Sequence, residues 1–120
     1  MVADLHTELR SLIRQTAVRL EHVGELVEST KWGQPSFAPA KPRIGSSVRL
    51  QTNDDGTSSL MFICNTGLVD QFRAMYGDAL TFIGNREIKV EKLTDSNRPV
   101  LMGCVSMALT YHLSKRAAKT

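Results

Sequence analysis

The sequence predicts an α+β protein in which an antiparallel sheet of four to five strands packs against helices. Three observations predict this class. A helical pattern opens the chain, two stretches in the middle alternate like hairpins, and a second strong helical pattern closes the chain. Because helices flank strands that pair locally, helices packed on one side of an antiparallel sheet are the simplest arrangement.

The first element is predicted as helical over residues 3–30. Its apolar positions recur at three- and four-residue spacing, which places them on one face of a helix. They are Leu5, Leu9, Leu12, Ile13, Thr16 and Leu20. The stripe shifts near residues 17–19 and continues through Val23, Leu26 and Val27. The segment is therefore either one bent helix or two helices that meet there.

A loop and a first hairpin are predicted next. Residues 31–46 are rich in glycine and proline, and residues 36–38 within them are predicted as a short edge strand, because flanking prolines disfavour a central one. Residues 48–52 alternate between apolar and polar, which indicates a half-buried strand. The Asp-Gly pair at 55–56 predicts a turn, and the apolar run 60–64 predicts a central strand.

The second half of the chain is predicted as helix, hairpin and helix. Asn65 or Thr66 caps a helix that runs to about Tyr76, where Gly77 ends it. Its inner face is predicted to hold Leu68, Val69, Phe72 and Met75. Residues 80–83 and 86–91 form a second hairpin around Gly84-Asn85. The last helix starts after Ser96 or Asn97, with Pro99 in its first turn, and runs to about residue 115.

Bulk composition limits the class of protein. The 120 residues suit one domain over 1–120, with 42% apolar and 22% charged residues. No apolar run approaches the roughly 20 residues needed to span a bilayer, and the N-terminus has no apolar core of a signal peptide. Cys64 and Cys104 lie in apolar runs as expected for buried free thiols, so we expect a cytoplasmic protein. The net charge of +3 is spread along the chain, which argues against nucleic-acid binding.

Local motifs give no support for catalysis. The chain contains no G-x-S-x-G, G-x-G-x-x-G or G-x-x-x-x-G-K pattern. Cys64 and His112 would meet only through tertiary packing, and a core thiol with a helix-end imidazole is the simpler interpretation. We therefore expect a binding role rather than an enzymatic one.

A candidate metal site lies in the predicted N-terminal helix. Glu21, Glu25 and Glu28 are spaced at i, i+4 and i+7, which places them on one helical face, and His22 lies beside that face. Oxygen ligands with a neighbouring imidazole suit iron or another divalent ion. The alternative is a solvated acidic face balanced by Arg19 and Lys31.

A candidate ligand pocket combines aromatic and polar residues that fall at the ends of predicted elements. If these ends converge, they line a concave pocket with a few polar groups. The residues are Trp32, Phe37, Tyr76, Arg86, Tyr111 and His112. The alternative is that the aromatic residues close the edge of the core and direct their polar atoms to backbone carbonyls.

Three runs in the chain resemble one protein family. The run KWGQPSF at residues 31–37 resembles the K-W-G-x-P-x-F signature of the YdhG-like family, a bacterial family of unknown function. Residues 76–88 and 104–112 resemble two later family stretches, in family order, so the resemblance spans roughly residues 5–115. It implies a frataxin-like α/β sandwich. It also implies a link to iron, since at least one member is regarded as an iron chaperone for iron–sulfur cluster and haem assembly; here that role would rest on Glu21, Glu25 and Glu28.

The sequence thus predicts a small cytoplasmic binding protein that handles iron or another small ligand. The alternative is a protein-interaction module, such as a homodimer, that uses the outward face of the sheet. Residues expected on that face are Arg49, Gln51, Glu87 and Lys89. An enzyme acting near Trp32, Arg86 and His112 ranks third.

Overall fold

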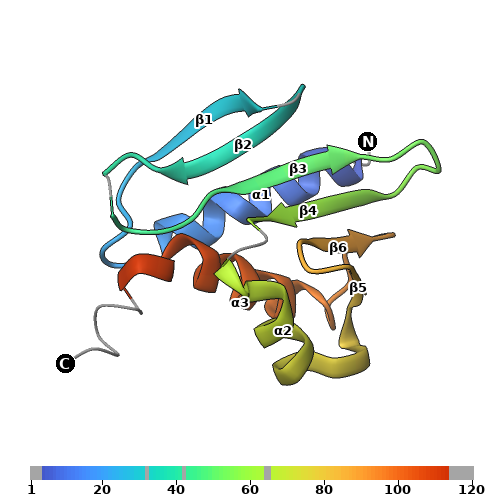
Figure 1. The fold of residues 1–120 in the computed structure, drawn as a ribbon. Helices are drawn as coiled ribbons and strands as arrows, with labels where there is room; N and C mark the ends of the chain where they lie inside the picture. Colours follow the sequence, from blue (N-terminus) through green and yellow to red (C-terminus); the bar gives the residue numbers. More distant parts are fainter. Residues whose placement is uncertain (1–3, 32, 42, 64–65, 114–120) are drawn as a thin grey trace.

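The computed structural model describes residues 4–31, 33–41, 43–63 and 66–113 (Figure 1). Within them, six strands form one antiparallel sheet in the order β1-β2-β3-β4-β6-β5, and helices pack on one of its faces. The elements are α1 (Leu5–Val18), β1 (Leu26–Lys31), β2 (Gln34–Pro39), β3 (Val48–Thr52), β4 (Ser58–Phe62), α2 (Leu68–Tyr76), the 3₁₀ helix η2 (Gly77–Ala79), β5 (Thr81–Ile83), β6 (Glu87–Val90) and α3 (Arg98–Leu109). The predicted α+β class is confirmed, with one strand more than the four to five expected.

Helix α1 begins and packs as its sequence predicts. The Asp4 carboxylate accepts a hydrogen bond from the Thr7 backbone N–H at 2.8 Å, which satisfies one of the free donors of the first turn. Its buried face consists of Leu9, Leu12, Ile13, Thr16 and Ala17. The helix ends at Val18, whose side chain is exposed.

The predicted helix over residues 20–30 is wrong. Gly24 adopts a positive φ of 68°, and residues 26–31 form β1, which pairs with β2 along its whole length. Leu26 and Val27 continue the helical spacing by coincidence, whereas the burial of residues 26–29 alternates as in a strand. Pairing with β2 makes this segment a strand, and the spacing of its apolar residues could not reveal that pairing.

Strand β2 is internal, although its prolines predicted an edge. It pairs with β1 on one side and with β3 on the other. Its ladder with β3 contains only Ser36 and Phe37, and Pro35 and Pro39 fall outside it. The missing proline N–H groups therefore interrupt no bond to β3.

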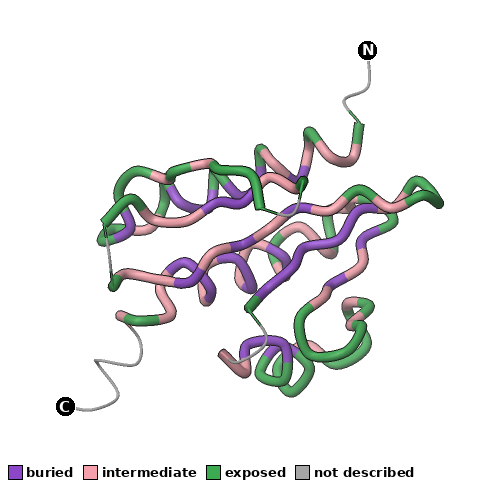
Figure 2. The backbone as a smooth tube through the Cα atoms, turned by 45° about the horizontal axis from the view of Figure 1, so that its top comes forward, coloured by how far each residue is buried: buried purple, intermediate pink, exposed green. Residues whose placement is uncertain are grey.

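The two predicted hairpins and the central strand are confirmed. β3 pairs with β4 around the turn at residues 53–57, and β5 pairs with β6 around residues 84–86. Every residue of β4 is buried, as expected for a central strand (Figure 2). Apolar side chains of β3, β4 and β6 meet those of the helices in one hydrophobic core.

Helices α2 and α3 close the core with small departures from prediction. Gly67, rather than Thr66, is the N-cap of α2, although the Thr66 hydroxyl accepts a hydrogen bond from the Leu68 N–H at 3.2 Å; Asn65 lies outside the described residues. Gly77 ends α2 at a φ of 54°, as predicted. Met75, predicted to face inward, is 58% exposed.

Of the helices in the described part of the chain, none is long and apolar enough to cross a bilayer.

Helix α3 begins after Asn97 and carries Pro99 in its first turn, as predicted, but it ends at Leu109 instead of near residue 115. Residues beyond 113 lie outside the described range. Cys104 is a buried free thiol on this helix, and burial raises its pKa to about 12, so the thiol stays protonated. Cys64 lies outside the described residues.

The loop before β3 is clamped to the end of α3 by backbone contacts. The Ser46 N–H donates to the Ala108 carbonyl at 2.7 Å, and the Ile44 carbonyl accepts from the N–H groups of His112 and residue 113. Gly45 lies so close to α3 that a Cβ there would sit 1.9 Å from the Leu109 carbonyl oxygen. Only glycine fits this contact.

We therefore expect Gly45→Ala to destabilise the fold by about 2 kcal/mol or more, since the added methyl meets rigid backbone. Gly103→Ala is the matched control: its Cβ would meet only the Tyr76 hydroxyl, which is the movable end of a side chain, and alanine favours a helix interior. Urea unfolding of both variants measures the difference. Equal stability of the two variants would contradict the clamp.

Candidate functional site

The sheet has one face on the helices and one open face. Val48, Leu50 and Leu60 contribute to the core beneath the helices. Because side chains alternate along a strand, their neighbours project from the other face. The register places Ser36 of β2 opposite Arg49 of β3, and Arg49 opposite Met61 of β4. These side chains form one row across the open face.

A hollow of about 340 Å³ lies on this open face. We call it the sheet pocket. It is lined by Lys31, Ser36, Ser47, Arg49, Met61, Phe62, Ile63 and Arg86. Ser36 and Met61 are only 3% and 6% exposed although they project away from the helices, so they lie at the floor of the hollow. The carbonyl of Arg86 accepts from the Phe62 N–H at 2.7 Å, which holds this residue beside the end of β4.

The sheet pocket is strongly cationic. Lys31, Arg49 and Arg86 line it, and no described lining residue is acidic. None of the three cations makes an ion pair with a described residue. Lys89, on the same face, differs because its ammonium lies 2.9 Å from the Asp55 carboxylate. The unpaired positive charge of this face is therefore concentrated at the sheet pocket.

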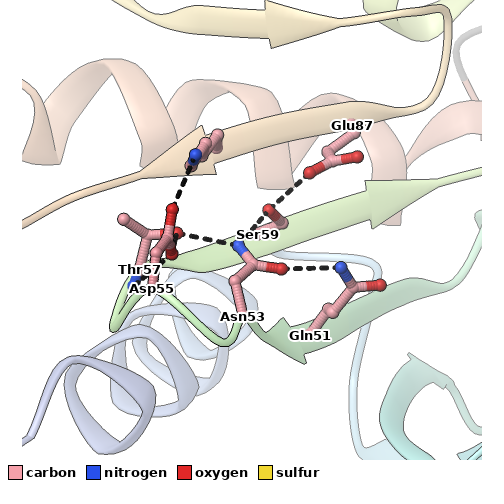
Figure 3. Close-up of polar contacts among 7 residues, drawn as sticks. Gln51, Asn53, Asp55, Thr57, Ser59 and Glu87 are labelled. Atoms are coloured by element: carbon pink, nitrogen blue, oxygen red, sulfur yellow. Dashed lines mark hydrogen bonds and ion pairs between the residues drawn. The ribbon is translucent and has the colours of Figure 1, made fainter.

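The other end of the open face is a closed polar network (Figure 3). Asn53 donates to the Ser59 hydroxyl at 3.0 Å, and Ser59 in turn donates to the Glu87 carboxylate at 2.7 Å. Gln51 joins the network by donating to the Asn53 side-chain carbonyl at 2.7 Å. The register places Glu87 opposite Met61, beside the sheet pocket, but its carboxylate accepts from Ser59 and makes no ion pair with Lys31, Arg49 or Arg86.

Asp55 closes the network at the β3–β4 turn. The Thr57 hydroxyl donates to its carboxylate at 2.6 Å and the Thr57 N–H at 3.0 Å. These bonds, the Thr57 hydroxyl first, together with Lys89 hold the pKa of Asp55 well below its ordinary value. The same pair raises the pKa of Lys89.

A second hollow, of about 390 Å³, adjoins the first at the end of α3. We call it the helix-end pocket. It is lined by Gly45, Ser46, Ser47, Ile63, Thr66, Tyr111 and His112. Ser47 and Ile63 line both pockets. The rings of Tyr111 and His112 meet edge to face, with centroids 5.1 Å apart.

Of the six residues predicted to line a ligand pocket, the structure places three along these adjoining hollows. Arg86 lines the sheet pocket, and Tyr111 and His112 line the helix-end pocket. Phe37 is fully buried in the core, with the guanidinium groups of two α1 arginines over its ring. Trp32 lies outside the described residues.

Tyr76 is also away from the two pockets. Its hydroxyl lies against Gly103 in the middle of α3, and burial, followed by the nearby Cys104 thiol, raises its pKa. Phe37 and Tyr76 therefore do not line the predicted pocket, because both pack against helices.

The predicted acidic metal face does not form. Glu28 lies on strand β1, and Glu21 and Glu25 lie in the segment between α1 and β1. The three acids therefore share no helical face. Glu28 instead projects toward α1 and pairs with Arg10 and, at 2.8 Å, with Arg14. In the described ranges, no three His, Cys, Asp or Glu side chains lie close enough together to bind a metal.

The remaining two members of that set lie at the surface. The exposed Glu21 carboxylate has the imidazole of His22 3.9 Å away, and this weak contact is surrounded by solvent. Glu25 is exposed on the loop before β1, where its backbone carbonyl accepts from the N–H of residue 40. Glu21 and Glu25 therefore fit the alternative interpretation, in which they are solvent-exposed surface acids. Glu28 instead has a structural role in an ion pair with α1.

Sequence reasoning missed Lys31, Ser36 and Ser47 as site residues. The alternating pattern of β3 did place Arg49 on the outward face, but it gave no hint that Lys31 of β1 would join it. That neighbourhood depends on the strand order β1-β2-β3, which the helical interpretation of residues 26–30 concealed.

A third hollow is larger than these two but is the weaker candidate. It measures about 480 Å³ and runs along one face of α1, past Arg10, Arg14 and Arg19. Arg10 and Arg14 are already bound to Glu28 and cover the Phe37 ring. Glu28 compensates one of these two positive charges and holds the β1–β2 hairpin against α1, so both guanidinium groups already have a carboxylate partner, unlike the cations of the sheet pocket.

Comparisons with protein-family models, with curated proteins and with solved structures found no match to this chain. A functional role must therefore be inferred from the two adjoining pockets themselves.

Replacing Asp55 with Asn should lower stability at neutral pH, and this loss should shrink in acid. A carboxyl whose pKa is lowered by folding stabilises the fold above its unfolded pKa, near 3.8, and this contribution disappears as the pH falls through the folded value. Urea unfolding of the parent and Asp55→Asn at several values between pH 7 and pH 3 should show a constant difference down to about pH 5 and a smaller one below pH 4. A difference that does not vary with pH would contradict the role of the charge.

Glu28→Gln should destabilise the fold by about 1 kcal/mol, since it removes a partly buried carboxylate shared by two arginines. Glu21→Gln is the control, because it makes the same charge change at a 90% exposed side chain. Thermal unfolding with and without ferrous iron measures both effects. A shift with iron that Glu28→Gln abolishes would instead restore the metal interpretation.

Proposed function

We propose that this chain is a small-ligand-binding protein that holds an anion of the phosphate class in the sheet pocket. The observation that carries this proposal is the convergence of Lys31, Arg49 and Arg86, without acidic partners among the described residues, on one hollow. Like charges gathered without a counterion are unfavourable in the empty protein, and a bound anion relieves that repulsion.

The residue types suit a phosphate. Arginine presents a planar fork of N–H donors that matches two phosphate oxygens, and lysine adds a compact charge. The hydroxyls of Ser36 and Ser47 supply neutral donors at the same hollow. Its volume of about 340 Å³ lies within the range of small-molecule sites, roughly 300–1,000 Å³.

Binding explains the pocket better than catalysis does. Activation of a serine nucleophile requires a base within hydrogen-bond reach. Among the described residues, neither Ser36 nor Ser47 has such a bond to an imidazole or a carboxylate. The proposal is therefore a binding protein, without a reaction assigned to it.

Membership in the bacterial YdhG-like family and a cytoplasmic location stay proposals that rest on the sequence. A family of small proteins without assigned activity agrees with a ligand-binding role. Iron handling, which the same resemblance implies, gains no support from the described side chains, since Glu28 is engaged by arginines and no acidic cluster forms. We propose an anionic ligand in place of iron.

A protein-interaction module is the second candidate and is less favoured. It was expected to use the outward face around Arg49, Gln51, Glu87 and Lys89. Three of these four side chains bond within the face itself, and all four are half-buried. The two edge strands offer smaller interaction surfaces on this side, with Val27 of β1 50% exposed and Ile83 of β5 43% exposed.

The proposal is tested by titrating the protein with inorganic phosphate and following backbone amide resonances by NMR. We expect the largest shifts at residues of the sheet pocket. Arg49→Gln should weaken binding by about 10- to 100-fold, since a hydrogen bond to a charged group contributes about 1.5–3 kcal/mol.

Arg19→Gln is the matched control, because it removes the same charge from the exposed end of α1. It should change phosphate affinity by less than about twofold. Equal weakening by the two substitutions would show diffuse attraction to a basic surface, and absence of shifts in the sheet pocket would refute the site.

A further inference from the structure

We infer that the ligand is a hydroxyl-bearing phosphate monoester, such as a sugar phosphate or a nucleoside monophosphate, that spans both pockets. Its phosphate lies in the sheet pocket and its organic part in the helix-end pocket. This inference rests on the proposed function and adds the chemical class of the ligand.

The first support is that the two hollows are continuous. Val48 and Phe62 form the last pair of the β3–β4 ladder on this side. Ser47 precedes that pair and Ile63 follows it, and both residues line both pockets. A ligand held at Arg49 therefore reaches the helix-end pocket directly across the end of the sheet.

The second support is the difference in charge between the two hollows. The sheet pocket holds three cations, whereas no described lining residue of the helix-end pocket is Lys, Arg, Asp or Glu. Of its described lining residues, His112 alone has a basic side chain. The carboxyl end of α3 and the amino end of α2 both border it, and their partial charges have opposite signs. This balance suits an uncharged polar group joined to the anion.

The third support is a buried hydroxyl that has no hydrogen-bond partner in the described part of the chain. Ser46 is 6% exposed, lines the helix-end pocket, and its Oγ makes no hydrogen bond with a described residue. Its backbone N–H is fixed on the Ala108 carbonyl, so the residue is held in place. Buried hydroxyls are normally hydrogen-bonded, and a ligand hydroxyl in this pocket would supply the missing bond.

The lining groups also match a sugar or nucleoside in kind. The hydroxyls of Ser47 and Thr66 and the imidazole of His112 can exchange hydrogen bonds with ligand hydroxyls. Ile63, which is 46% exposed at the junction of the two hollows, offers an apolar contact for the carbon skeleton. A bare phosphate would leave all these groups unused.

The test titrates the parent protein by calorimetry and NMR with inorganic phosphate, ribose 5-phosphate and adenosine monophosphate. We expect ribose 5-phosphate to bind at least about 10-fold more tightly than phosphate, with added shifts at Thr66, Tyr111 and His112. A further gain with adenosine monophosphate supports a nucleotide, and equal affinity supports a sugar phosphate.

Two other outcomes are separable. If phosphate binds in the sheet pocket but the esters bind no more tightly, the inference is overturned and the proposed function stands. If neither phosphate nor any ester binds, the proposed function fails, and the inference fails with it.

Variants of the helix-end pocket sharpen the result. Ser46→Ala should reduce ribose 5-phosphate affinity by about 3- to 10-fold and leave phosphate affinity unchanged. It should also leave the unfolding midpoint unchanged, because its hydroxyl bonds to no described residue. His112→Ala, at an exposed side chain, should act in the same direction. A loss that is equal for phosphate and for the ester would contradict the division of the ligand between the two pockets.

Discussion

Backbone hydrogen bonds join residues 44–46 to the last turn of α3 and to residues 112–113 just after it, and the placement of both pockets depends on this contact. The loop reaches α3 at Gly45, where no side chain fits, and it then enters β3 two residues after Ser46. The same few residues therefore fix Ser46 in the helix-end pocket, Ser47 at the junction and Arg49 in the sheet pocket. A shift of α3 against the sheet would separate the two hollows, so packing of the core and geometry of the site are linked through one loop.

The open face of the sheet divides its polar chemistry between two ends. At the β3–β4 turn, Asn53, Ser59, Glu87 and Lys89 satisfy one another or Asp55, and little remains for a ligand. Toward the opposite end, the cations have no acidic partner among the residues that the structure describes. Arg49 is half-buried, whereas Lys31 and Arg86 are exposed to solvent. Polar groups that are withdrawn from water are normally paired within the fold, so the lack of a described acidic partner matters most for Arg49. The contrast within one face is therefore the physical reason to assign the unpaired end to a ligand.

Local signals in the sequence predicted most of the fold. The alternation of β3, the apolar run of β4 and the Gly-Asn turn before β6 each depend on neighbours in the chain, and each was predicted correctly. β1 was not, because Val23, Leu26 and Val27 fit helical spacing, and only pairing with β2 makes residues 26–31 a strand. That error also produced the metal hypothesis, since Glu21, Glu25 and Glu28 share a face only on a helix.

The candidate site, like the fold, was predicted where local sequence signals decide it and missed where pairing between distant segments decides it. Arg86, Tyr111 and His112 were recognised because they fall at the ends of elements, and the structure places them on the adjoining hollows. Phe37 was misassigned because nothing in the sequence indicates that Arg10 and Arg14 lie over its ring. Lys31 and Arg49 are 18 positions apart in the sequence, and their convergence depends on the order of three strands.

Charge pairing across the molecule explains why an anion, rather than a metal ion, suits this chain. The close carboxylate–cation pairs among the described residues lie away from the sheet pocket: Glu28 with the α1 arginines, Asp55 with Lys89, and Asp70 with Arg73. Each of these pairs removes a potential metal ligand and a potential partner for the sheet pocket at the same time. The positive net charge of +3 is also distributed unevenly, because three cations that have no ion pair with any described residue line one hollow. An anion that enters this hollow gains their attraction without displacing an existing ion pair among the described residues.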